Sequence, residues 1–189
     1  MRKKIVVQDY DATWPKTFEQ LYVTIWPVIS DIATTIEHVG STSVPGLSAK
    51  PIIDMTIVIP SASQMPTLIQ RLATIHYTHN GDQGVPGREA FRRPPETSAH
   101  NLYACAKGNL NLRNHLAIRD YLRQHPKDVQ AYGNLKKQLA EKFPHDIDAY
   151  VDGKTELLLD ILAKAGFTQE ELQEIQGINT MPPVQKQNK

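Results

Sequence analysis

Cysteine is almost absent from this sequence, in which Cys105 is the single cysteine among 189 residues. An internal disulfide is therefore excluded, and such sparse use of cysteine is typical of a reducing cytoplasmic compartment. No segment approaches the roughly 18 consecutive apolar residues that span a bilayer. The apolar run from Ile5 to Val7 is too short for the core of a signal peptide. These absences predict a soluble cytoplasmic protein with no membrane partner.

An excess of charge of one sign is also missing, since 21 Lys and Arg residues face 20 Asp and Glu residues. Proteins that coat DNA or anionic membranes carry a clear basic excess. Aromatic and basic residues do not alternate as they do in binders of single-stranded nucleic acid. The seven histidines and the cysteine lack the spacing of a zinc site. We therefore expect a small-molecule substrate or a nucleotide as partner rather than a nucleic acid, and no pattern specifies an oligomeric state.

Hydrophobic periodicity separates a strand-rich part of the chain from a helical part. In chain order, the pattern predicts a helix from Trp14, strands over 34–39 and 51–59, a helix after Ser61, strands over 88–93 and 98–106, and helices from residue 111 to residue 176. A run of strands followed by a run of helices indicates an α+β fold. We predict one globular unit with an α+β core over 1–108, a helical part over 109–178 packed on it, and a flexible tail over 179–189.

A carboxylate interrupts the apolar strand predicted over 51–59. Asp54 and Thr56 share one face of that strand, because side chains alternate between the two faces. A buried carboxylate is costly unless it is paired or binds a cation. The pattern therefore predicts that a cationic side chain or a metal ion lies next to Asp54.

The loop before this strand is rich in hydrogen-bonding groups. Its hydroxyls and amides form the kind of concave array that holds a phosphate, and they belong to Gly40, Ser41, Thr42 and Ser43. Lys50 adds a point charge. Mg²⁺ would connect a bound phosphate to Asp54, since magnesium is usually held by carboxylates and phosphate oxygens together. The alternative is an ordinary turn, with Asp54 paired to a structural arginine.

Two positions on the predicted hairpin are further candidates for phosphate binding. Arg92 shares a strand face with Arg88, and the two arginines either line a cleft or form a solvated basic edge. His100 lies on the second strand of the hairpin and is either a ligand-binding or a structural histidine.

The helical part contributes four more candidates for the same site. Arg119 falls on the apolar stripe of its helix, where an arginine requires an acidic partner or a bound anion. His115 lies one turn earlier, within reach of the same place. Tyr150 and Lys154 take an equivalent position on the buried face of a later helix. The alternative for each is a structural role, such as an interhelical salt bridge.

Four blocks of sequence carry a resemblance to a known family. They read, in chain order, IEHVGSTSVPGLSAKPIID, HNLYAC, LAIRDYLRQHP and YVDGKTELLLDIL. On these blocks the sequence resembles the GrpB family from Trp14 to Gly166. That family is itself similar to the DNA polymerase β-type nucleotidyltransferases.

The resemblance implies a nucleotidyltransferase-like mixed sheet with flanking helices, a Gly-Ser motif after one strand, and an Asp-x-Asp or Asp-x-Glu motif on the next. Gly40-Ser41 and Asp54 occupy the matching positions, whereas Thr56 replaces the second carboxylate. Asp54 and Thr56 are therefore the predicted Mg²⁺ ligands, and a two-metal clamp would need further acidic ligands. The chain contains no Gly-x-x-x-x-Gly-Lys-Ser/Thr loop, so a P-loop kinase is not indicated.

Three functions are compatible with these residues. The first is an enzyme that transfers a nucleoside monophosphate from an NTP to a small acceptor with Mg²⁺, with Asp54 and Lys50 as catalytic residues and Arg119 neutralising charge. The second keeps the pocket without catalysis and binds a nucleotide or a phosphorylated metabolite. The third is a docking module built on the helical part, whose exposed faces show no large apolar patch.

Overall fold

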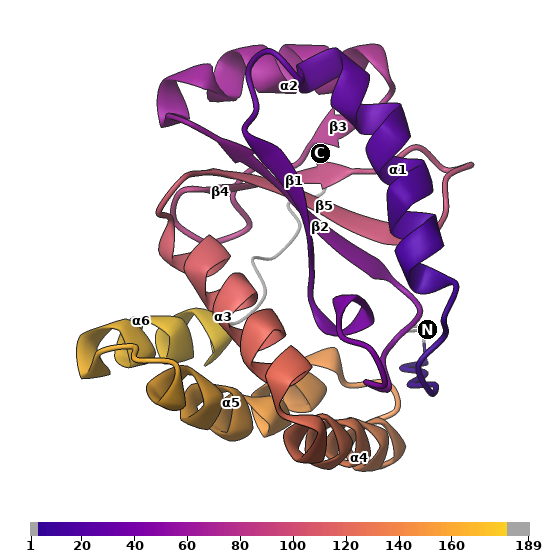
Figure 1. The fold of residues 1–189 in the computed structure, drawn as a ribbon, viewed down its shortest axis with the longest axis vertical. Coiled ribbons are helices and arrows are strands. Elements are labelled where there is room, and N and C mark those ends of the chain that lie inside the picture. Colours follow the sequence, from indigo (N-terminus) through magenta and orange to yellow (C-terminus); the bar gives the residue numbers. More distant parts are fainter. Residues whose placement is uncertain (1–3, 181–189) are drawn as a thin grey trace.

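The computed structural model of the chain describes residues 4–180. The described residues form a five-stranded sheet of β1 (Thr35–Val39), β2 (Ile53–Ile59), β3 (Thr78–His79), β4 (Arg88–Arg92) and β5 (His100–Ala106). Its helices are α1 (Trp14–Ile29), α2 (Met65–Thr74), α3 (Leu110–Gln124), α4 (Pro126–Lys142), α5 (Ile147–Lys164) and α6 (Gln169–Thr180). Helices α1 and α2 cover one face of the sheet, and α3 to α6 gather on the opposite side (Figure 1).

The sheet is mixed, with the strand order β1-β2-β5-β4-β3. Strands β2 and β5 are parallel, whereas β1 with β2, β4 with β5 and β3 with β4 are antiparallel. The predicted α+β class, the mixed sheet and its flanking helices are confirmed. No sequence pattern predicts β3, because an element of two residues is too short to show a period of alternation.

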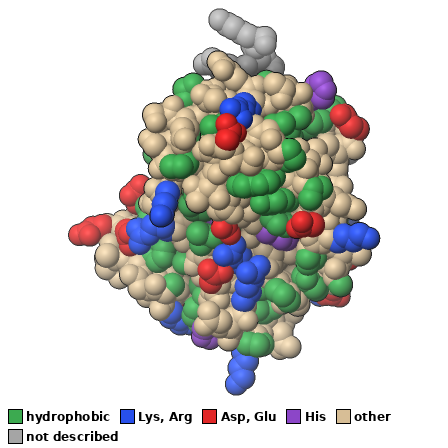
Figure 2. Space-filling view, turned by 45° about the horizontal axis from the view of Figure 1, so that its top comes forward, with side chains coloured by type: hydrophobic (Ala, Val, Ile, Leu, Met, Phe, Trp, Pro, Cys, Tyr) green, Lys and Arg blue, Asp and Glu red, His purple; other side chains and the backbone are tan. Residues whose placement is uncertain are grey.

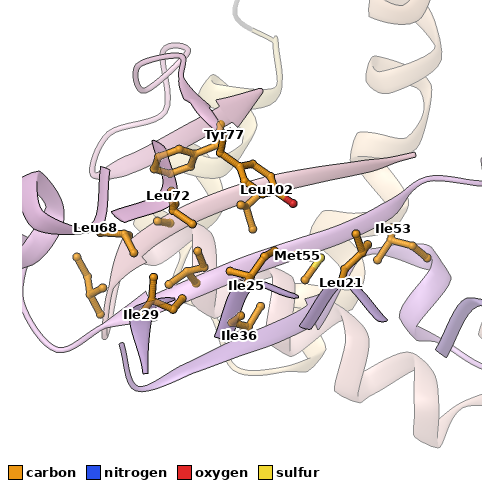
Figure 3. Close-up of a cluster of buried hydrophobic side chains, with 14 of the residues drawn as sticks. Leu21, Ile25, Ile29, Ile36, Ile53, Met55, Leu68, Leu72, Tyr77 and Leu102 are labelled. Atoms are coloured by element: carbon orange, nitrogen blue, oxygen red, sulfur yellow. The ribbon is translucent and has the colours of Figure 1, made fainter. Parts of the chain in front are cut away.

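Alternation along β2 decides which of its side chains meets which layer of helices. Ile53, Met55 and Ile57 point into the main apolar core. Figure 3 shows Met55 in that core, which also contains Ile25 of α1 and Leu72 of α2. Asp54 and Thr56 must then face the other side of the sheet, toward the helical part.

The helical part is attached to the sheet by the loop that follows β1. Val44 and Leu47 of this loop are buried in an apolar cluster with Leu122 of α3, Val129 of α4 and Ile161 of α5. Residues from the predicted core and from the predicted helical part therefore share one cluster, and this cluster fixes the position of the loop.

The last turn of α6 overlaps the start of the segment predicted as a flexible tail. Residues 179 and 180 complete the last turn of α6, and the rest of the predicted tail, 181–189, lies outside the described residues. The prediction ended this helix near residue 176, because the last turn carries too few apolar residues to extend the periodic pattern. The helix itself continues to Thr180.

The surface carries charges of both signs. On the face shown in Figure 2, Lys and Arg side chains lie among Asp and Glu side chains, with apolar side chains between them. Within residues 4–180, no helix combines the length and the apolarity that a crossing of the bilayer requires.

Candidate functional site

A polar pocket lies where the loop after β1 meets the ends of β2 and β5 and helices α4 and α5. We call it the lysine pocket, and its lining consists of Ser41, Thr42, Ala49, Lys50, Ile52, Asp54, Asn101, Lys136, Tyr150 and Lys154. Its volume is about 140 Å³. Side chains from segments more than 100 residues apart in the sequence therefore converge on one cavity, and six of them were predicted site residues.

Asp54 meets the loop through a glycine that has no room for a side chain. Gly40 has φ 68° and ψ −172°, a conformation that is open essentially to glycine alone. A Cβ at this position would also lie 2.9 Å from Asp54 Cβ and would collide with the Asp54 carboxylate. The Gly-Ser sequence thus lets the loop pass directly over the carboxylate, and this places Ser41 beside Asp54 in the lining.

The Asp54 carboxylate has one hydrogen-bond donor and three cationic neighbours. Asn101 Nδ2 donates to Asp54 Oδ1 at 2.7 Å from the adjacent strand, where the two residues are paired in register. Burial raises the pKa of Asp54, while the Asn101 hydrogen bond and the charges of Lys50, Lys154 and Lys136 oppose that shift. In the structure, the Asp54 carboxylate is therefore bonded to the Asn101 amide and surrounded by lysines. The structural arginine of the alternative prediction is not its partner.

Lys136 of α4 is the most deeply buried of the three lysines, with 2% of its surface exposed. Its Nζ donates to Ser41 Oγ at 2.8 Å and lies 4.4 Å from the centroid of the Tyr132 ring. Burial, reinforced by the charges of Lys154 and Lys50, lowers the pKa of Lys136 to about 6. A buried ammonium loses its hydration, so the uncharged amine is favoured.

The other two lysines lie near one aromatic ring. Lys154 Nζ is 4.7 Å from the centroid of the Tyr150 ring, and Lys50 Nζ is 5.7 Å from it. Burial, followed by the charge of Lys50, lowers the pKa of Lys154 to about 8. Aromatic faces attract cations, so Tyr150 stabilises both charges while closing one side of the pocket.

Three hydroxyl side chains of the loop have different environments. Ser41 faces the pocket and is bonded to Lys136. The Thr42 hydroxyl lies 3.0 Å from His38 Nε2. Ser43 Oγ donates to Gly40 O at 2.6 Å, and its carbonyl oxygen accepts from Arg123 of α3. Ser43 therefore holds the loop in shape and does not line the pocket.

Two predicted hairpin residues lie away from the pocket. Arg92 is exposed on β4 and is not part of the lining. His100 points to the opposite face of the sheet, where its ring bonds the Tyr77 hydroxyl at 2.7 Å and the Ser98 carbonyl at 2.8 Å. Because strand side chains alternate, the pocket receives the neighbouring residue Asn101 instead.

Thr56 and His115 lie on the helical side of the sheet but outside the lysine pocket. Thr56 is buried, and neither residue is in the lining. Within the described part of the chain, Thr56 Oγ1 and His115 Nδ1 are buried without a hydrogen-bond partner. Burial, together with the charge of Arg88, lowers the pKa of His115 to about 4. The structure therefore does not bring these two predicted residues to the lysine pocket.

Arg119 joins α3 to the sheet. Its Nη1 donates to Glu37 Oε2 of β1 at 2.7 Å and to the His38 carbonyl at 3.1 Å, and its Nε donates to Asp120 Oδ1 at 2.7 Å. Its side chain is 14% exposed, and it is absent from the pocket lining. Arg119 therefore has the structural role that the sequence analysis gave as the alternative. Its partner Glu37 was not indicated by the sequence.

Replacing Arg119 by glutamine is expected to lower the free energy of unfolding by about 1–3 kcal/mol, because partly buried charged partners are left unsatisfied. Arg113→Gln is a matched control on the same helix. The Arg113 side chain is 48% exposed, and its pair with Glu171 is expected to contribute less than about 1 kcal/mol. Urea denaturation measures both changes in the free energy of unfolding. Equal losses in the two variants would contradict the structural role assigned to Arg119.

Sequence reasoning missed the two polar lining residues Lys136 and Asn101, as well as the apolar Ala49 and Ile52. Lys136 lies one turn after Tyr132 on the buried face of α4, and a lysine on an apolar stripe is the same signal that identified Arg119. The sequence indicates Asn101 less clearly. Alternation along β5 shows only that Asn101 and His100 point to opposite faces of the sheet. The register between β2 and β5 is needed to place it beside Asp54.

The donor set does not fit a magnesium clamp. The described lining contains one carboxylate, Asp54, one of whose oxygens already accepts from Asn101, and it contains three lysines. Thr56, the second predicted ligand, is not in the lining. Among the residues from 4 to 180, no group of three or more His, Cys, Asp or Glu side chains could hold a metal ion. Magnesium binding through Asp54 stays a prediction.

The architecture is that of a nucleotidyltransferase. A crystal structure of the Cid1 poly(U) polymerase with MgGTP bound aligns with a TM-score of 0.51 over 71% of this chain and 44% of that one, at 14% sequence identity. An identity this low shows the fold alone. The class of fold that the resemblance implied is therefore confirmed.

The chain belongs to the GrpB family, whose model, described as GrpB protein, matches residues 4–164. The crystal structure of GrpB from Enterococcus faecalis is similar, with a TM-score of 0.76 and 32% identity over 90% of this chain and 99% of that one. The UPF0157 protein YqkA of Bacillus subtilis is 34% identical over 155 residues, which are 82% of this chain and 45% of YqkA. The chain thus spans less than half the length of that relative.

Proposed function

We propose that the lysine pocket binds the phosphate group of a nucleotide or of another phosphorylated small molecule. The observation that carries this proposal is the convergence of Lys50, Lys136 and Lys154 around a single described carboxylate. Even with Lys136 uncharged and Asp54 ionised, the lining keeps a net positive charge. Ammonium groups and hydroxyls are good donors to phosphate oxygens.

The size of the pocket limits which part of the ligand enters it. A volume of about 140 Å³ is below the several hundred Å³ of pockets that enclose whole drug-sized molecules. The pocket therefore suits a compact anionic group, and the remainder of a nucleotide or metabolite would extend from its mouth.

A second candidate function is Mg²⁺-dependent transfer of a nucleoside monophosphate from an NTP to a small acceptor. It is favoured by the nucleotidyltransferase fold and by the position of Asp54 beside Gly40-Ser41. The two candidates differ in what Asp54 does. In the first it is a negative charge among cations, and in the second it is a metal ligand.

Asp54→Asn separates these roles, because it removes the charge and keeps the shape. If the pocket binds phosphate through its lysines, inorganic phosphate and ATP in EDTA should bind about tenfold more tightly to the variant, a change of about 1.4 kcal/mol. Isothermal titration calorimetry measures this change. Ligand at 100 times its dissociation constant should also stabilise the fold by about 2.7 kcal/mol in thermal unfolding.

Two lysine variants complete the experiment, one inside the pocket lining and one outside it. Lys154→Gln should weaken binding, whereas Lys137→Gln, which alters an exposed lysine on α4 paired with Asp9, should leave it unchanged. Binding of ATP that requires Mg²⁺ and disappears in Asp54→Asn would favour nucleotidyl transfer. Absence of binding by phosphate and by every NTP at millimolar concentration, with and without Mg²⁺, would contradict both candidates.

A further inference from the structure

Ser41 and Lys136 form a pair that phosphate binding alone does not require. The Nζ to Oγ distance is 2.8 Å, and the two residues come from parts of the chain 95 positions apart. The Ser41 side chain lines the pocket, whereas the hydroxyls of Thr42 and Ser43 bond to His38 and to the backbone of the loop. Thr42 also belongs to the lining, but Ser41 is the loop residue whose hydroxyl is bonded to a lysine of the pocket.

The surroundings of Lys136 favour its uncharged form. Within the described residues it makes no ion pair with a carboxylate. The titratable groups around it are Lys50, Asp54, Tyr132, Tyr150 and Lys154. One carboxylate cannot compensate three ammonium groups in a confined pocket, so the deepest lysine is the one that gives up its proton. An uncharged amine has a lone pair that can accept the proton of a serine hydroxyl.

We propose that Ser41 is a nucleophile that attacks a phosphorus atom of the bound ligand and that Lys136 is its general base. This inference rests on the proposed phosphate-binding function. A hydroxyl is a weak nucleophile unless a neighbouring base removes its proton, and lysine takes this role beside serine in several unrelated enzymes. The pocket would then catalyse transfer of a phosphorus group through a covalent serine intermediate.

The step is balanced in atoms and protons. A bond forms between Ser41 Oγ and phosphorus, and the bond between phosphorus and the leaving oxygen breaks, with no change in oxidation state. Lys136 takes the proton of Ser41 and then gives it to the leaving oxygen. Lys50 and Lys154 neutralise the charge on the remaining phosphate oxygens. A water or an acceptor hydroxyl, deprotonated by Lys136, then attacks phosphorus. The bond between phosphorus and Ser41 Oγ breaks, and Lys136 returns the proton to Ser41 Oγ.

The test is covalent labelling of the full chain. The protein is incubated with ATP or acetyl phosphate, in EDTA and in Mg²⁺, and the product is analysed by intact mass and peptide mapping. A phosphoryl or nucleotidyl group on Ser41 is expected, and Ser41→Ala should abolish it. Lys136→Arg keeps a positive charge that cannot be released near neutral pH, so it should slow labelling by about 100-fold or more. Lys137→Arg is the matched control and should label normally.

A second measurement needs no variant. In the wild-type chain the labelling rate should rise as pH increases through about 6, since the lowered pKa of Lys136 lies there. Labelling in Lys136→Arg at the wild-type rate, or a rate that does not change across this pH range, would overturn the role of Lys136. Phosphate binding without any adduct on Ser41 would overturn the nucleophile and leave the binding function standing. Absence of phosphate binding would overturn both.

Discussion

Replacing Lys136 by methionine is expected to make the protein more stable while weakening the proposed binding of phosphate. Methionine matches the length of the buried stem and removes an amine that must give up its proton when the chain folds. Replacing buried charged groups by apolar ones of similar volume is often stabilising by about 1–4 kcal/mol. Urea denaturation at pH 7 measures the gain, and calorimetry measures the lost affinity for phosphate.

The pH dependence of this gain has a definite sign. The pKa of Lys136 is lowered from 10.5 to about 6 in the folded chain, so between these values the unfolded chain binds more protons than the folded one. The wild-type free energy of unfolding therefore rises with pH in this window. The advantage of Lys136→Met should be largest below pH 6 and should shrink as the pH approaches 10.

Lys137, the next residue on α4, provides the matched control for Lys136. Lys137→Met alters an exposed lysine of the same helix, and its stability should stay close to that of the wild type. A Lys136→Met variant that is less stable than the wild type at pH 7, or whose advantage grows with pH, would show that Lys136 is charged and paired in the folded chain.

The second large effect is expected at Gly40. Gly40→Ala should lower the free energy of unfolding by roughly 2–4 kcal/mol, because alanine is strained at this backbone conformation and its Cβ collides with Asp54. The Asp54 carboxylate, which accepts a hydrogen bond from Asn101, must shift to make room. Phosphate affinity should therefore change together with stability, and chemical denaturation followed by calorimetry measures both.

Gly81→Ala separates backbone strain from the collision. Gly81 has φ 67°, nearly the same as the 68° of Gly40, but no atom lies within 4 Å of a Cβ built on it. Its replacement should cost about 1 kcal/mol and leave binding intact. If the two variants lost equal stability, the close approach of Gly40 to Asp54 would not be a constraint on the fold.

Much of the fold follows from local patterns. The helix from Trp14, the strands that become β1, β2, β4 and β5, and the helices after residue 110 are placed by hydrophobic periods and by proline and glycine signals. The candidate site is only partly predictable in this way. Asp54 and the Gly40 loop are close in sequence and are joined by one strand, so their proximity follows from chain connectivity.

The remaining site residues depend on the tertiary structure. Lys136 and Asn101 enter the lining because α4 packs on the loop after β1 and because β5 pairs with β2 in one particular register. The same packing gives Arg119 a partner on β1 and turns His100 to the opposite face. No local pattern encodes which charged residue of a helix will meet a ligand and which will meet another side chain.

The sequence alone determined that a carboxylate lies in an apolar strand beside a glycine and serine loop, because strand alternation and chain connectivity act over a few residues. Only the tertiary structure decided the charge of the site. Three lysines from three segments surround that carboxylate, and their burial lowers the pKa of two of them. Burial and the distances between charges exist only once the chain is folded, so the balance of charge around Asp54 could not be derived from the sequence.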